Sequence, residues 1–205
     1  MNSTIDDLDT GDIILFCGGS ESWLSWLTSI IKYSTHSNYT HIGVILKDPN
    51  FLAKPLEGTF IWESGWEGIP DPQDNKIKLG VQITNIKQML EEYNGEKIII
   101  RKFVGDRNKH FCSKNLQEIH KIVYNKPYDT HIIDWLLAFF RKDLKKQNTD
   151  RFWCSAFVGF IYTKCGVLKD DTDWSVLYPS DFSLDGENLN FVNGCSLENS
   201  ETRIV

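Results

Sequence analysis

The segment from Phe152 to Val158 constrains the fold more than any other part of the chain, because here a polar, charged run changes into an apolar helical pattern. The pattern ends at Lys164-Cys165-Gly166, which has the basic last turn and the glycine stop of a helix C-terminus. Cys154 therefore falls in the first turn, where backbone N–H groups without helical partners favour a thiolate over a thiol. We expect Asp150 or Thr149 to cap this turn.

A cysteine in such a helix is more often a small core residue than a nucleophile, so the nucleophile hypothesis needs a base elsewhere in the chain. The segment 40–46 is rich in β-branched residues and predicts a strand that contains His41. Side chains alternate along a strand, so His41, Gly43 and Ile45 share one face, and the glycine leaves room beside the imidazole. His36, in the polar loop before this strand, is the rival base.

A carboxylate that could orient the histidine lies on the next predicted strand. The apolar run at 59–65 should pair with the histidine strand as a hairpin, which would place Glu63 beside the imidazole. Glu67 is the rival for this position. If Glu63 has no functional role, we expect it to be an exposed carboxylate at the end of the strand.

The remaining pattern predicts short elements of both kinds. Further strands are expected at 13–16, 79–83 and 97–103, and helices at 20–33, 86–90, 113–124 and 131–142. The tail from 183 to 205 is polar, with Phe191-Val192 as its one candidate strand. No Pro/Gly/Ser-rich linker divides the 205 residues, so we expect a single domain over 1–205.

Composition excludes several classes of protein. The chain has 22 Lys and Arg residues against 28 Asp and Glu residues, a net charge of -6 and no basic block, so we expect no nucleic-acid partner. It begins with an acidic segment and contains no run of about 18 apolar residues, which favours a cytoplasmic protein. The five cysteines are scattered without a C-x-x-C pair, so we expect free thiols in a reducing compartment and neither metal nor cofactor.

Cys154, His41 and Glu63 supply the three residue types of a thiol hydrolase site, namely nucleophile, base and orienting carboxylate. In this interpretation His41 takes the proton of Cys154, and Glu63 fixes the tautomer of the imidazole. The thiolate would attack a carbonyl carbon and form a thioester. The backbone N–H of Cys154 is the expected first donor to the oxyanion.

Six motifs occur in the order found in one protein family. They are Gly11-Asp12-Ile13-Ile14, Thr35-x-Ser37-x-x-Thr40-His41-Ile42-Gly43-Val44, Trp62-Glu63-Ser64, Lys126-Pro127-Tyr128-Asp129, Cys154-Ser155-Ala156-Phe157-Val158 and Tyr178-Pro179-Ser180-Asp181-Phe182. This ordered set resembles the circularly permuted members of the papain-like NlpC/P60 superfamily, especially the bacterial YiiX/YaeF-like proteins and their poxvirus relatives. The chain differs in having Ala156 where the family often has Glu, and in a longer stretch between Tyr128 and Cys154.

The resemblance implies an α+β, permuted papain-like fold in which an antiparallel sheet packs against the cysteine helix. The matched motifs span a catalytic core at 11–182, followed by a C-terminal extension at 183–205. The implied activity is that of a cysteine peptidase or amidase, a thiol-protease-like hydrolase of peptide-like or fatty-acyl amide bonds. Family position adds Tyr128 and Asp12 as substrate-binding candidates, and Trp153, beside the cysteine, joins them. If the protein is viral, its place is the virion or the host cytoplasm.

Two other functions stay open at this point. The apolar helices expected within 20–33 and 131–142 would suit a lipid acyltransferase or lipid-ester hydrolase that uses the same triad, with a lipid substrate and peripheral membrane contact. A non-catalytic structural or binding module with an unused thiol is the third hypothesis.

Overall fold

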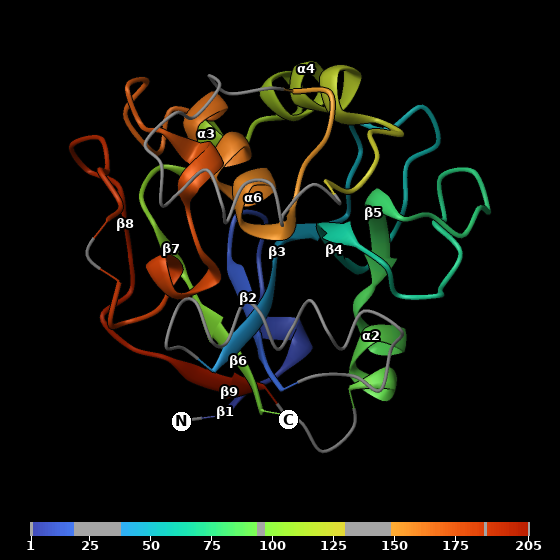
Figure 1. The fold of residues 1–205 in the computed structure, drawn as a ribbon, viewed down its shortest axis with the longest axis horizontal. Helices are drawn as coiled ribbons and strands as arrows, with labels where there is room; N and C mark the ends of the chain where they lie inside the picture. Colours follow the sequence, from blue (N-terminus) through green and yellow to red (C-terminus); the bar gives the residue numbers. More distant parts are fainter. Residues whose placement is uncertain (1, 19–37, 94–96, 130–148, 187, 205) are drawn as a thin grey trace.

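The chain folds around one β-sheet with helices on both of its faces, an α+β architecture (Figure 1). The structure is a computed structural model that describes residues 2–18, 38–93, 97–129, 149–186 and 188–204. The seven-stranded sheet has the strand order β1-β9-β6-β2-β3-β4-β5, and a smaller sheet joins β7 to β8. Neighbouring strands of the large sheet are antiparallel, apart from the parallel pair β1 and β9.

The described elements are short and follow one another irregularly along the chain. The strands are β1 (Asn2–Ser3), β2 (Ile13–Cys17), β3 (Tyr39–Lys47), β4 (Thr59–Gly65), β5 (Gly80–Asn85), β6 (Lys97–Arg101), β7 (Phe103–Val104), β8 (Ser196–Leu197) and β9 (Thr202–Ile204). The helices are η1 (Ile5–Asp7), α2 (Ile86–Glu92), α3 (Arg107–His110), α4 (Ser113–Val123), α6 (Cys154–Lys164), η2 (Trp174–Val176) and η3 (Pro179–Phe182). None of the helices that the structure describes is long and apolar enough to cross a membrane.

The two faces of the sheet pack into two separate cores. Ile42 and Val44 of β3 enter a large core together with α6 and α4, and Figure 1 shows α6 at the centre of the molecule with α4 beyond it. Ile45, the residue between Val44 and Leu46, enters a smaller core on the other face, where it joins Met89 of α2. The predicted alternation along β3 is therefore confirmed, and it places His41 on the face of Ile45.

The strongly apolar segments form the elements that the sequence predicts. The strands at 13–16, 40–46 and 59–65 are confirmed, and β3 and β4 pair as the expected antiparallel hairpin. The strands at 79–83 and 97–103 and the helices at 86–90 and 113–124 are also present, with shifted ends.

The C-terminal tail differs from the prediction. Phe191 forms an isolated bridge to Leu168 rather than a strand, whereas β8 and β9 are the strands of the tail. β9 pairs with β6 inside the large sheet, although Ile204 is its one buried residue. The sequence therefore has no apolar run that would predict this strand. The helices expected at 20–33 and 131–142, together with His36, lie outside the described residues.

Replacing Phe157 with Ala should test how firmly α6 is held on the sheet. Phe157 is fully buried, and its ring packs edge-on against Trp62 of β4 with ring centroids 5.4 Å apart. We expect the free energy of unfolding, measured by urea denaturation, to fall by about 3–5 kcal/mol. The matched change Leu184→Ala, at a side chain that is 47% exposed, should cost less than about 0.5 kcal/mol. Similar losses for the two variants would contradict this view of the core.

Candidate active site

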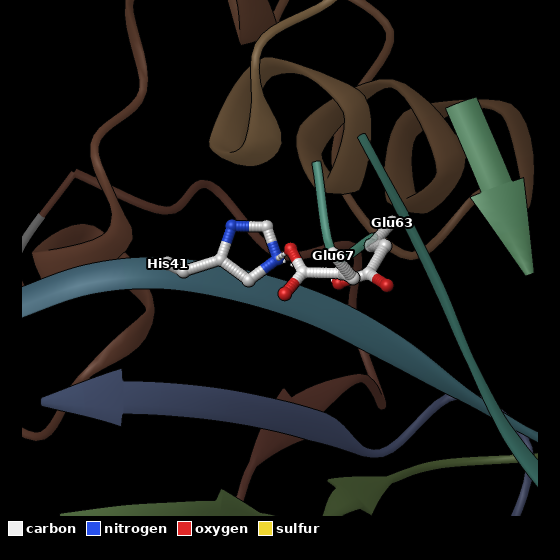
Figure 2. Close-up of side chains that lie close together, drawn as sticks. All are labelled: His41, Glu63 and Glu67. Atoms are coloured by element: carbon white, nitrogen blue, oxygen red, sulfur yellow. Dashed lines mark hydrogen bonds and ion pairs between the residues drawn. The ribbon is translucent and has the colours of Figure 1, made fainter. Parts of the chain in front are cut away.

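His41 and Glu63 meet across the β3–β4 hairpin, as Figure 2 shows. His41 Nε2 lies 2.6 Å from Glu63 Oε2, which is the distance of a strong hydrogen bond or ion pair. The Glu63 side chain has no solvent exposure, and the His41 side chain is 11% exposed. The structure thus brings together the imidazole and the carboxylate that the sequence selected.

Cys154 lies close to this pair, at the start of a helix. It is the first residue of α6, and it lies close enough to His41 to raise the pKa of the imidazole. Because Nε2 is occupied by Glu63, Nδ1 is the ring nitrogen left for the sulfur, and it points away from the glutamates in Figure 2. Thiol, imidazole and carboxylate are therefore grouped in one site, with the sulfur at the start of a helix.

The start of α6 is not capped as expected. Trp153 is the N-cap residue, and its side chain makes no capping hydrogen bond. Asp150 instead pairs with Lys126 at 3.6 Å, and extended backbone at Phe152 separates it from the helix. The prediction of Asp150 or Thr149 as the cap is therefore wrong. An N-terminus without a capping side chain can offer its N–H groups to a substrate oxyanion.

The surroundings of His41 favour its charged form. Burial alone lowers the pKa of His41, but the interactions of the imidazole with Cys154 and with the Glu63 carboxylate raise it more. The net effect is a pKa well above the ordinary value of 6.5. At neutral pH the imidazolium is thus stabilised, as a thiolate–imidazolium pair requires.

Glu63 is held by a donor on each of its oxygens. The hydroxyl of Thr84, on β5, donates a hydrogen bond of 2.5 Å to Glu63 Oε1, while His41 occupies Oε2. Buried carboxylates need such donors, because moving an ionised carboxylate out of water without a hydrogen-bond partner costs several kcal/mol. Thr84 was not found from the sequence, since the register between β4 and β5 decides which hydroxyl reaches Glu63.

The space beside the imidazole comes from Gly65 rather than from Gly43. A Cβ atom at Gly65 would lie 3.0 Å from His41 Cε1 and 2.9 Å from Glu67 Oε1. A Cβ atom at Gly43 would instead meet the side chain of Ile61. The prediction for Gly43 is therefore wrong, because the glycine that the ring needs lies on the neighbouring strand.

Ser64 positions the chain that leads into the cysteine helix. Its hydroxyl donates a hydrogen bond of 2.7 Å to the backbone oxygen of Phe152, two residues before Cys154. The same oxygen accepts from the backbone N–H of Asp129 at 3.1 Å, and the Phe152 N–H donates to the Pro127 oxygen at 3.2 Å. Adjacent residues of β4, Glu63 and Ser64, thus fix the two halves of the site.

The substrate-binding candidates fall in two different places. Tyr128 and Trp153 are buried close to the cysteine: Tyr128 bridges to Phe152, and Trp153 directly precedes Cys154. Burial first, and then the charges of Cys154, Asp129 and Glu67, raise the pKa of Tyr128 well above 10.0, so its hydroxyl keeps its proton and can donate.

Asp12 lies away from this group. Its carboxylate accepts hydrogen bonds from Arg107 at 2.6 Å and from the backbone of Phe103 and Asp9 at 3.0 Å. Asp12 precedes the end of β2 that pairs with Val44, whereas His41 pairs with Phe16, about 10 Å further along the strand. Asp12 therefore joins the turn before β2 to α3, and the structure does not place it with the triad.

Glu67, the rival carboxylate, reaches the same imidazole from the loop after β4. Its Oε1 lies 3.9 Å from His41 Nε2, and Tyr93 donates a hydrogen bond of 3.4 Å to its Oε2. His41, Glu63 and Glu67 offer three potential ligand atoms within 4.8 Å of one another. Ligands of a tetrahedral zinc ion would be about 3.3 Å apart, so the 2.6 Å contact describes a hydrogen bond rather than a pair of metal ligands.

Comparison with known proteins adds no identification. No protein-family model matches the chain, and no curated protein matches it significantly.

Replacing Ser64 with Ala should loosen the start of α6. The backbone oxygen of Phe152 would keep the Asp129 donor and lose the hydroxyl, so we expect the free energy of unfolding to fall by about 1 kcal/mol. Ser113→Ala is the matched control: its hydroxyl donates a 2.6 Å hydrogen bond to Asn50 that is exposed to water, so its loss should cost less than about 0.5 kcal/mol. Urea denaturation measures both, and an unchanged Ser64→Ala protein would show that the hydroxyl does not hold Phe152.

The raised pKa of His41 predicts a pH-dependent contribution to stability. The folded-state pKa exceeds the unfolded value near 6.5, so the folded protein binds this proton more tightly. The contribution is complete below about pH 6.5 and is lost as the pH rises through the folded-state pKa. Above about pH 6.5, the free energy of unfolding should therefore fall more steeply with pH in the wild type than in His41→Gln. Equal slopes in the two proteins would exclude the proposed stabilisation of the imidazolium.

Proposed function

We propose that the protein is a cysteine hydrolase that cleaves a peptide-like or fatty-acyl amide bond through a thioester on Cys154. The observation that supports this most directly is the hydrogen-bonded pair His41–Glu63 with Cys154 close to the imidazole, at the N-terminus of a buried helix. A buried structural thiol would need neither an imidazole partner nor a carboxylate behind that imidazole.

The proposed reaction has two steps. The Cys154 thiolate attacks the carbonyl carbon, the C–N bond breaks, and the imidazolium of His41 gives its proton to the leaving nitrogen. Water then adds to the thioester carbon while His41 accepts a proton, and the C–S bond breaks to release the acid. Glu63 stays ionised throughout and stabilises the imidazolium. The backbone N–H of Cys154 donates to the oxyanion in both steps.

The proposal includes a fold family, the permuted papain-like NlpC/P60 proteins. Its support is the order of the site residues, with His41 and Glu63 on neighbouring antiparallel strands before the Cys154 helix. The lipid acyltransferase alternative uses the same triad, and the segments 20–33 and 131–142, whose expected apolar helices motivate it, lie outside the described residues. The chemistry of the acyl donor therefore separates these two activities.

Trapping of the acyl-enzyme tests the proposal. Acyl-amide, peptide and lipid-ester substrates are each mixed with the protein, and intact-mass spectrometry records the adduct. We expect an acyl adduct on Cys154 with an amide substrate, and none in Cys154→Ala. Glu63→Gln should remain folded and turn over roughly 10³- to 10⁴-fold more slowly, because the imidazole loses its orienting charge. Adducts formed with lipid esters alone would favour the acyltransferase.

Alkylation by iodoacetamide provides the control without a substrate. At about pH 6.5 an ordinary thiol is mostly protonated, so Cys154 should react much faster than the half-buried Cys112. His41→Ala should remove this advantage and leave Cys112 unchanged. Equal rates for Cys154 and Cys112 in the wild type would point to the non-catalytic module.

A further inference from the structure

We propose that Glu67 is a positioning residue of this site. It is a second carboxyl group beside His41, and its own protonation state sets how tightly the imidazole of His41 binds a proton. This inference rests on the proposed function, in which His41 must hold and release a proton. It assigns Glu67 a role in addition to that of Glu63.

The geometry gives Glu67 direct access to the imidazole. Figure 2 shows the carboxyl groups of Glu63 and Glu67 both at the Nε2 side of the His41 ring. Glu63 is hydrogen-bonded at 2.6 Å, whereas Glu67 Oε1 is 3.9 Å away, too far for a hydrogen bond but close enough for a strong charge interaction. Gly65 keeps this approach open, because a Cβ there would lie 2.9 Å from Glu67 Oε1.

Glu67 is also shielded from water, so solvent screens little of the interaction between its charge and neighbouring charged groups. Its side chain is only 7% exposed, although it lies on a loop. The ionisable groups that act on it are His41 of β3, Glu63 of β4, Glu92 and Tyr93 at the end of α2, and Tyr128. Tyr93 is the group that donates a hydrogen bond to the carboxyl, at 3.4 Å.

These neighbours place the ionisation of Glu67 in the neutral range. Burial first, and then the charge of Glu63, raise the pKa of Glu67 to about 7, while His41 and the Tyr93 hydroxyl act in the opposite direction. The interaction is mutual: the protonated imidazole of His41 stabilises the ionised carboxylate of Glu67, and the ionised carboxylate stabilises the protonated imidazole to the same extent. Between about pH 6 and pH 8, His41 should therefore hold its proton more tightly as Glu67 loses its own.

Side-chain titration by NMR measures this coupling without any substrate. The full-length protein is labelled with ¹³C at glutamate carboxyl and histidine ring carbons and titrated from about pH 4 to about pH 10. In Glu67→Gln, the midpoint of the His41 titration should fall by about one unit or more, a tenfold weaker hold on the proton. Glu91→Gln removes an exposed carboxylate of the same type from α2, one that does not act on Glu67, and should leave the His41 midpoint within about 0.3 units.

Tyr93→Phe gives a second test in which Glu67 itself is kept. Loss of the hydroxyl donor should move the Glu67 midpoint to higher pH, because the hydrogen bond favours the ionised carboxyl. A merely structural role for Glu67 would not produce either shift. An unchanged His41 midpoint in Glu67→Gln, or a wild-type Glu67 midpoint near the ordinary 4.3, would overturn the inference.

The same samples separate this inference from the proposed function. Iodoacetamide labelling of wild-type Cys154 reports on the nucleophile, whereas the NMR midpoints report on Glu67 and His41. An inert Cys154 with coupled midpoints would reject the hydrolase and keep the coupling. A reactive Cys154 with uncoupled midpoints would reject the role of Glu67 alone.

Discussion

A carboxylate with no contact with water, that of Glu63, is the constraint on which the rest of the site depends. Burying an isolated carboxylate costs several kcal/mol, and its two hydrogen bonds, from Thr84 and His41, each return about 1.5–3 kcal/mol. These quantities nearly balance, so the arrangement adds little net stability. What it does provide is a fixed negative charge behind His41, which keeps the imidazole oriented and protonated.

The site is built from two sides of one strand. Glu63 and Ser64 are neighbours on β4, and because side chains alternate along a strand they act in opposite directions. Glu63 holds the imidazole, while Ser64 holds the backbone of Phe152 just before the cysteine. A shift of β4 by one residue would exchange these two faces and separate histidine from cysteine. The pairing of β4 with β3 and β5 thus determines the site as directly as the side chains do.

The sequence predicted the parts of the structure that depend on strong local patterns. The strands that carry His41 and Glu63, their hairpin and the Cys154 helix follow from apolar runs with clear ends. The contributions of Thr84 and Gly65 depend on strand register, which hydrophobic pattern alone does not specify. β9 escaped prediction for a related reason, since its place inside the sheet is secured by pairing with β6 and not by an apolar face of its own.

The missing cap of α6 is explained by how the helix is held. Every residue from Cys154 to Thr163 is buried, so packing on all sides fixes the helix and leaves little need for capping energy. Its first turn is tied down instead by the Ser155 hydroxyl, which donates a 2.6 Å hydrogen bond to the backbone oxygen of Leu177. A capping side chain would have occupied the N–H groups beside the sulfur. Anchoring the turn through its flanks leaves those groups without a capping side chain, which is the condition that the proposed stabilisation of an oxyanion requires.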